Sequence, residues 1–522
     1  MLALSIDKKR EFRIFWRILV KTVWAVGLVA ILASCGTSPG YNYTISGTVS
    51  GMIGSGLVLQ DNGGDDQTIS VNGAFAFATA LTSGTAYSVT IKTHPTNPSQ
   101  TCVVSNGSGT ISGSPVYDVA VSCVMSSSPV TVDPSGLFAY VSNSSPGNIS
   151  AYDINQTTGA LVSVPVSAGN PFPAGTSPTS VTIYANPSGE FAYVPNMGSD
   201  TISAYDINQT TGALVSVPVS AGNPFPAGTS PTSVTIYANP SGGAYAYVPN
   251  IGSDTISAYI INSDGSLTAV TGSPFTAGTS PTSVTVYANS SGAYAYVPNM
   301  TDGTISAYTI DNTTTPGALI PSFNTPTVTA GAYPTSVTIY ANPSGGAYAY
   351  VPNMGSGNIS VYTINSDGSL STGTAVTAGT YPMSVTVYTN PSGGAYAYVS
   401  NMGSGNISVY TINSDGSLST GTAVTAEMYS NPVTVYANTS GAFAYVSNRN
   451  DGTIWVYSIG TNGALTNIQQ ISSGISFASL TTVTIDPQGP YAYASDVNTG
   501  AVYAFTIDST TGKLNAVTGS PF

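Results

Sequence analysis

Residues 181–220 decide the fold and read VTIYANPSGEFAYVPNMGSDTISAYDINQTTGALVSVPVS. Their β-branched and aromatic residues alternate with small ones in four short runs, which Gly, Asn, Asp and Pro separate. Alternation broken by turn residues predicts strands joined by tight turns. The four strands predicted in this stretch span 181–184, 191–194, 201–207 and 213–219.

The same unit recurs throughout residues 126–522. Its eight copies begin 48 to 53 residues apart, at Val130, Val181, Val234, Val284, Val337, Val385, Val433 and Val483. Residues 149–189 recur unchanged as 202–242, which indicates recent duplication. Four strands in each of many copies predict a β-propeller of four-stranded blades. A linear β-solenoid is the main alternative, but its coils are usually shorter.

Tyrosine alternates with alanine in the second predicted strand of most copies, as in 244–248, AYAYV. One face of that strand is therefore bulky and the other is small. Stacked blades need such complementary faces, so we interpret the tyrosines as core residues. A surface on which a ligand stacks is the alternative.

The N-terminal segment 1–34 has the pattern of a lipoprotein signal peptide. Six Lys and Arg residues precede an apolar run at 22–32, which is too short to span a membrane. The run ends in Leu-Ala-Ser-Cys at 32–35, which resembles the bacterial lipobox. This resemblance implies a lipid on Cys35 and a short tether at 35–40. Because Gly36 follows the cysteine, it also implies an outer-membrane lipoprotein on the periplasmic or cell-surface side.

The chain is acidic and poor in charged residues. Its formal net charge is −13, and only 6% of its residues are charged, against about 25% in an ordinary soluble domain. Removal of segment 1–34 would leave a net charge of −17. Phosphate backbones are bound by Lys and Arg patches, so this composition argues against a nucleic-acid partner.

Residues 41–125 predict a small β-sandwich domain of about seven short strands. Cys102 and Cys123 lie in two of these strands. Since the predicted signal peptide implies export to a compartment that permits disulfides, we expect the two cysteines to be bonded to each other. The segments SGLVLQDNGGDD at 55–66 and SVNGAFAFATAL at 70–81 resemble the sequence of a domain that often follows the lipobox in bacterial lipoproteins. The sandwich is expected to be of immunoglobulin-like or carboxypeptidase-regulatory-like type.

The repeated pattern PSGxxAYVxNxxxxxISxYxI resembles the YVTN-type, lactonase-like (6-phosphogluconolactonase-like) β-propeller family. The resemblance covers 126–522 and implies the propeller fold. Members of that family usually have seven blades. Since eight complete units are present, we predict eight blades, with seven as the alternative if a terminal unit is displaced.

The resemblance also implies a place for catalytic residues. Lactonase-like proteins are associated with His, Arg and Glu near the central cavity, and a His often follows a Pro ahead of the first strand. The matching positions are candidates at the mouth of the tunnel: Ser180, Ser233, Ser283, Ser336 and Ser384. Arg449 and Glu190 are weak catalytic candidates. We expect Arg449 to be solvated or paired with Asp451, because it lies in a predicted turn.

Two aspartates distinguish the first and last copies. Asp133 and Asp486 replace the asparagine of the six copies between them, and closure of the ring would bring their blades together. A weak divalent-cation site is conceivable there, but Asp before Pro also suits a tight turn. We expect no other cofactor.

Three functions remain open from the sequence. A non-catalytic, lipid-anchored propeller that binds a protein or glycan is the first, because near-identical blades present the same loops repeatedly. A lactonase-like hydrolase is the second, and a purely structural envelope protein is the third. A serine without a His or Lys base is a poor nucleophile, which disfavours the hydrolase.

Overall fold

The computed structural model describes residues 42–522 except 51, 53–54, 94, 96–99, 126–128, 145–146, 323–325, 473–478 and 498–499. The predicted signal peptide, Cys35 and the tether lie outside the described residues. Among the described residues, no helix combines the length and the apolar character needed to cross a membrane.

Ten strands form the N-terminal β-sandwich. They are β1 (Asn42–Tyr43), β2 (Ile45–Ser50), β3 (Leu57–Asp61), β4 (Asp65–Ile69), β5 (Gly73–Ala76), β6 (Leu81–Thr82), β7 (Ala86–Thr93), β8 (Gln100–Ser105), β9 (Ser108–Thr110) and β10 (Val116–Met125). Two four-stranded sheets, β5-β2-β10-β8 and β4-β3-β7-β9, enclose one apolar core to which both contribute. β1 pairs with β6 at one end.

The predicted disulfide is confirmed. Cys102 on β8 and Cys123 on β10 are directly paired in the antiparallel register and are bonded to each other. Both side chains are buried within the sandwich core. The Asp-rich segment 61–66 forms the hairpin turn between β3 and β4.

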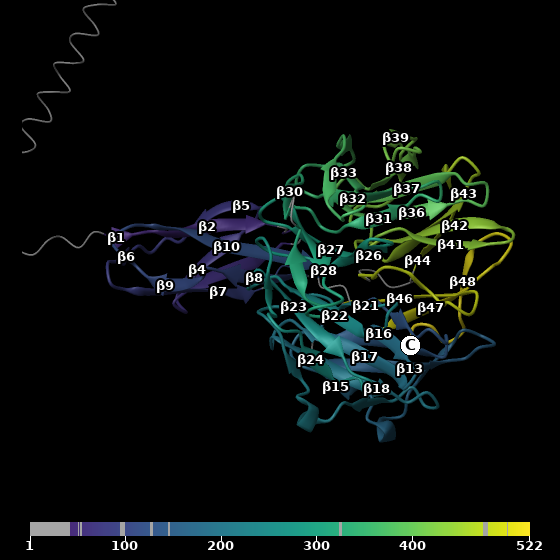
Figure 1. Ribbon diagram of the computed structural model, residues 1–522, viewed down its shortest axis with the longest axis horizontal. Helices are drawn as coiled ribbons and strands as arrows, with labels where there is room; N and C mark the ends of the chain where they lie inside the picture. The colour runs from purple at the N-terminus through teal and green to yellow at the C-terminus, as the bar shows by residue number, and fades with distance from the viewer. Residues whose placement is uncertain are drawn as a thin grey trace, which may run out of the picture.

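Eight sheets follow the sandwich in the described part of 129–522, and we number them blades 1 to 8 (Figure 1). The first strands are β11 (Thr131–Val132), β16 (Thr182–Asn186), β21 (Thr235–Ala238), β26 (Thr285–Asn289), β31 (Thr338–Ala341), β36 (Pro382–Thr389), β41 (Thr434–Asn438) and β45 (Thr484–Ile485). The second strands are β12 (Phe138–Asn143), β17 (Gly189–Asn196), β22 (Ala244–Asn250), β27 (Gly292–Asn299), β32 (Ala347–Asn353), β37 (Ala395–Asn401), β42 (Gly441–Ser447) and β46 (Tyr491–Ser495).

Third and fourth strands complete each antiparallel blade. The third strands are β13 (Asn148–Ile154), β18 (Thr201–Ile207), β23 (Thr255–Ile261), β28 (Thr304–Ile310), β33 (Asn358–Ile364), β38 (Asn406–Ile412), β43 (Thr453–Ile459) and β47 (Val502–Ile507). The fourth are β14 (Leu161–Ser163), β19 (Leu214–Ser216), β24 (Leu267–Ala269), β29 (Leu319–Pro321), β34 (Leu370–Thr372), β39 (Leu418–Thr420), β44 (Leu465–Ser472) and β48 (Leu514–Ala516).

The fourth strand of blade 2 differs from the predicted run 213–219. It stops at Ser216, a short 3-10 helix spans Val219–Ala221, and a separate strand, β20 (Phe225–Pro226), pairs with the other end of β18. Proline cannot donate to a strand ladder, so the prolines of this segment interrupt it. The side chain of Asn223 fills the gap, since it donates to the carbonyl of Ala204 and accepts from its N–H, both at 3.0 Å.

In five other blades, too, the third strand pairs with two short strands, the fourth strand and an extra strand, instead of with one long strand. The extra strands are β15 (Phe172–Pro173), β25 (Phe275–Thr276), β30 (Thr327–Thr329), β35 (Val376–Thr377) and β40 (Val424–Thr425), and blade 1 also has a 3-10 helix at Val166–Ala168. In blade 7 the single long strand β44 covers the whole third strand instead.

The eight blades close into one ring. In every blade, a threonine hydroxyl of the first strand donates to a valine carbonyl of the next blade at 2.6 to 3.1 Å. The last of these bonds runs from Thr484 in blade 8 to Val130 in blade 1. The predicted number of eight blades is therefore confirmed for the described residues.

Tyrosines form a second ring of contacts that also closes. The second aromatic residue of each second strand is a fully buried tyrosine, and its hydroxyl donates to a glycine carbonyl of the next blade. At the closing junction, Tyr493 donates to Gly159 at 3.2 Å. The interpretation of these tyrosines as core residues is confirmed.

Candidate functional site

The turns between second and third strands share one face of the propeller with the connections between blades. We call this the Asn face, because an asparagine ends each second strand of blades 2 to 6 there: Asn196, Asn250, Asn299, Asn353 and Asn401. These side chains are fully buried, and each accepts the N–H of a glycine in the connection that enters its own blade. The turns between first and second strands lie at the opposite face, which we call the turn face.

Four of the five candidate serines precede the first strands at the Asn face, and Ser384 lies within the first strand β36. Their hydroxyl oxygens are buried and have no hydrogen-bond partner among the described residues. The threonines that precede four of these serines make contacts between blades; for example, Thr179 donates to the carbonyl of Thr232 at 2.7 Å. The hydroxyl oxygens of Ser180, Ser233, Ser283, Ser336 and Ser384 are therefore not accessible to solvent in this structure.

Asp133 and Asp486 lie at the turn face, on the two blades that meet at ring closure. Asp133 accepts the N–H of Phe138 at 2.8 Å and the hydroxyl of Ser135, and Asp486 accepts the N–H of Gln488 at 2.8 Å. Burial raises the pKa of Asp486 above its ordinary value. Backbone hydrogen bonds to its carboxylate oppose this shift, and the charge of Asp133 adds to it. Both aspartates thus cap turns. Among the described residues, no group of three or more His, Cys, Asp and Glu side chains could hold a metal ion.

Glu190 also belongs to the turn face. It lies near the start of β17, and its carboxylate accepts a hydrogen bond from Gln209 at 3.2 Å. Partial burial raises its pKa above the ordinary value. Arg449 follows the other end of a second strand, β42 in blade 7. The two weak catalytic candidates therefore lie at opposite faces of blades 2 and 7, and the ring does not bring them together.

The environment predicted for Arg449 is wrong. The side chain is only 4% exposed, and Asp451 instead accepts hydrogen bonds from Thr453. The Nε of Arg449 donates to Asn431 at 2.9 Å, whereas Nη1 and Nη2 have no partner among the described residues. Burial lowers the pKa of this guanidinium to about 10.

Arg449 takes the place of an apolar residue of the repeat. The same turn carries a buried methionine or isoleucine in blades 2 to 6: Met197, Ile251, Met300, Met354 and Met402. An alignment of the repeats reveals Arg449 as an exception, because the five equivalent residues are all apolar. The hydroxyl of Ser430 and the carbonyl of the Asn448 side chain, which flank Arg449, also lack partners among the described residues. Two unpaired guanidinium nitrogens are suited to hold a carboxylate or phosphate.

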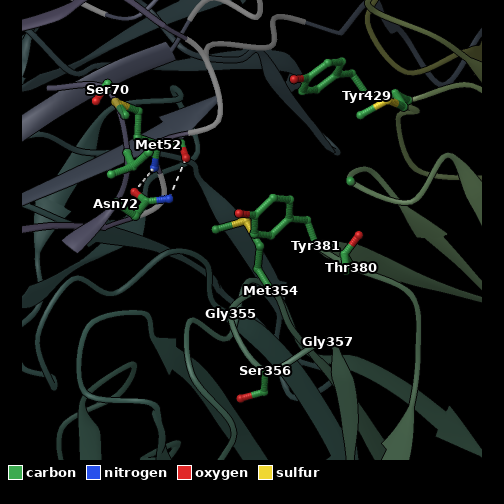
Figure 2. A pocket seen from close by; sticks show the side chains of 13 residues that line it. Met52, Ser70, Asn72, Met354, Gly355, Ser356, Gly357, Thr380, Tyr381 and Tyr429 are labelled. Atoms are coloured by element: carbon green, nitrogen blue, oxygen red, sulfur yellow. Dashed lines mark hydrogen bonds between the residues drawn. The ribbon is translucent and has the colours of Figure 1, made fainter.

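A cavity of about 640 Å³ lies between the sandwich and the Asn face of blades 5 to 7 (Figure 2). Met52 and Asn72 form part of its wall on the sandwich side, and Met354, Tyr381 and Tyr429 on the propeller side. Asn72 holds this wall in place, because it both donates to and accepts from the backbone of Met52 at 2.7 and 2.8 Å. The sequence alone does not reveal this site, since the site depends on the packing of one domain on the other.

Fold and site together define a β-propeller with an attached β-sandwich. A family described as "Lactonase, 7-bladed beta-propeller" matches residues 118–436 and 421–521. The chain therefore belongs to this lactonase family of propellers. It has one blade more than the family description states.

Several solved structures are similar to this chain. The Pseudomonas aeruginosa periplasmic gluconolactonase PpgL is 14% identical, with 73% of this chain and 96% of that chain covered and a TM-score of 0.44. A protein from Lactobacillus plantarum is 18% identical, with coverages of 70% and 90% and a TM-score of 0.43. Dihydro-haem d1 dehydrogenase NirN is 15% identical, with coverages of 75% and 75% and a TM-score of 0.51. No curated protein matches the sequence.

Proposed function

We propose that this chain is a lipid-anchored envelope protein whose propeller binds a partner, a protein or a glycan, and does not hydrolyse a lactone. The separation of Arg449 from Glu190 carries the proposal. Lactone hydrolysis needs a base to activate water beside a donor that holds the oxyanion. These two groups lie on different blades at opposite faces, and the sequence of 126–522 contains no histidine.

The environment of Arg449 supports the same proposal. Burial lowers the pKa of its guanidinium, and the one side-chain hydrogen bond that it makes among the described residues is to Asn431, which is not a base. A donor without a neighbouring base can hold an anionic group but cannot by itself activate water. The arrangement is therefore suited to binding.

A lactonase-like hydrolase is the second candidate, and the family match favours it. The two unpaired nitrogens of Arg449 would serve as the donors to an anionic substrate or an oxyanion. In that case the base would come from a residue that the resemblance does not identify.

Lactone hydrolysis by the purified protein distinguishes the two candidates. We expect residues 36–522, with or without Ca²⁺ or Mg²⁺, to hydrolyse 6-phosphogluconolactone and gluconolactone no faster than buffer does. Turnover that Arg449→Met or Glu190→Gln abolishes would contradict the binding proposal and support the hydrolase. Glu427→Gln serves as a matched control, because it removes the other glutamate of the propeller.

The anchoring part of the proposal depends on Cys35. A diacylated cysteine would hold the protein firmly to a bilayer, whereas a single acyl chain binds only marginally. We expect Cys35→Ala to move the protein from the membrane fraction to the soluble fraction. The variant Cys102→Ala controls for loss of a cysteine elsewhere. An unchanged membrane fraction for Cys35→Ala would refute the lipid anchor.

A further inference from the structure

Three tyrosines of blades 5 to 7 occupy a backbone position that is serine in blades 2 to 4. The tyrosines are Tyr333, Tyr381 and Tyr429, and the serines are Ser177, Ser230 and Ser280. All six have a positive φ, between 52° and 63°. Non-glycine residues rarely adopt this conformation, and a bulky side chain is especially uncommon there. Because serine meets the same backbone requirement in three blades, the fold itself does not call for tyrosine.

The three tyrosines lie on the Asn face, and the rings of Tyr333 and Tyr381 pack against glycines of the neighbouring turns. A Cβ placed on Gly403 would be 2.6 Å from Cδ2 of Tyr381, and one on Gly355 would be 2.5 Å from Cδ2 of Tyr333. Contact with bare backbone on one side leaves ring surface available on the other, and Tyr381 is 39% exposed. Successive blades thus place a row of aromatic rings along this face.

The row borders the cavity under the sandwich. Tyr381 and Tyr429 both line that cavity, and so does Gly355, on which Tyr333 packs (Figure 2). None of the 13 lining residues carries a charge. The volume of about 640 Å³ falls within the roughly 300–1,000 Å³ that is typical of small-ligand sites.

The lining combines aromatic faces with hydroxyl groups. An aromatic ring has a negative face, which attracts the weakly positive C–H groups of a sugar ring. Ser70, Ser356 and Thr380 add hydroxyls that can exchange hydrogen bonds with sugar hydroxyls. Arg449 is not among the residues that line the cavity, and an uncharged lining gives an ion no counter-charge there.

We propose that the cavity between the sandwich and blades 5 to 7 binds a neutral oligosaccharide, whose sugar rings stack on Tyr381 and Tyr429. Tyr333 extends the stacking surface along the same face. This inference rests on the proposed binding function and names the class of its ligand. It also gives the sandwich a role, since Met52 and Asn72 complete the wall of the site.

Calorimetric titration of the purified protein with neutral hexasaccharides tests the inference. The probes are cellohexaose, maltohexaose and chitohexaose, with hexagalacturonate as the anionic counterpart and N-phenyl-1-naphthylamine as the apolar one. We expect at least one neutral probe to bind. Tyr381→Ser and Tyr429→Ser should each weaken its binding about tenfold, and the double variant about a hundredfold, as for the loss of one stacked ring each.

Two controls accompany these variants. Tyr117→Ser removes a 71%-exposed tyrosine that lies on the sandwich outside the cavity, and we expect it to leave the affinity unchanged. The variants at 381 and 429 should remain folded by circular dichroism, because serine occupies the same backbone conformation in blades 2 to 4.

Three results would overturn the inference. They are the absence of binding by every neutral probe, binding that the double variant does not weaken, and binding of the apolar probe that no sugar displaces. Lactone turnover by the same preparation would contradict the proposed function. The titration would still show by itself whether the cavity binds a neutral oligosaccharide. Failure of the inference and failure of the proposed function are thus separable.

Discussion

Replacement of Arg449 by methionine should raise the free energy of unfolding by about 2 kcal/mol at pH 7. The guanidinium is buried, and two of its nitrogens have no partner among the described residues. Replacement of a buried ion pair by apolar side chains is often neutral or stabilising by about 1–4 kcal/mol, and a buried charge without a partner lacks even the attraction that offsets desolvation in a pair. The loss of the hydrogen bond to Asn431 offsets about 1 kcal/mol of that gain.

The pKa of Arg449 fixes the pH at which this difference should be measured. Burial lowers the pKa to about 10 from an ordinary value of 12.5. At pH 7 the arginine is charged in both the folded and the unfolded chain, so its full unfavourable effect is present. The effect diminishes only as pH rises through 10, where the folded form begins to lose its proton.

Methionine is the natural choice for this substitution. Four other blades carry it in the same turn, so its shape already fits the repeat. Arg449→Lys serves as the control, because it retains the charge and should give no gain in stability. Chemical denaturation in a buffer without phosphate or carboxylate provides the measurement. A loss of stability in Arg449→Met would show that the guanidinium has a partner that the described contacts omit.

The architecture could be predicted because it depends on local and repeated signals. The alternation within residues 181–220, and its return about every 50 residues, sufficed for four-stranded blades, for their number and for the buried tyrosines. The pairing of Cys102 with Cys123 followed from two apolar strands in a segment that was expected to be exported.

The outer edge of the blades could not be predicted in the same way. A run such as 213–219 has the composition of a strand, but it ends early because prolines interrupt it. The side chain of Asn223 then takes over hydrogen bonds that a strand backbone would have made. A polar side chain that substitutes for a ladder has no periodic signal in the sequence.

The candidate site depended on contacts between distant segments. Arg449 lies in a predicted turn, and only the assembled ring encloses it. The sequence shows that Tyr381 and Tyr429 stand where other blades have serine, yet only the docked sandwich makes them walls of a cavity. The carboxylates Asp133 and Asp486 were expected near each other, and the structure adds that their hydrogen bonds serve turns.

Gly159 lies at the junction where blades 8 and 1 close the ring. Its carbonyl accepts the hydroxyl of Tyr493, and a Cβ placed on it would lie 2.3 Å from Cδ1 of Tyr491. Gly368 has the same role at the junction of blades 4 and 5, where a Cβ would lie 2.0 Å from Cδ1 of Tyr294. Both glycines have positive φ, 72° and 78°.

The most direct test compares the free energy of unfolding of Gly159→Ala with two reference variants. Gly368→Ala should lower it by about 3 kcal/mol, because alanine adds both left-handed strain and a clash with a packed ring. Gly393→Ala should lower it by only about 1 kcal/mol, because φ is 88° there but no atom lies within 4 Å of the new Cβ. A closed ring of eight blades predicts that Gly159→Ala matches Gly368→Ala. A loss no larger than that of Gly393→Ala would contradict the closed ring and indicate that a terminal blade is displaced.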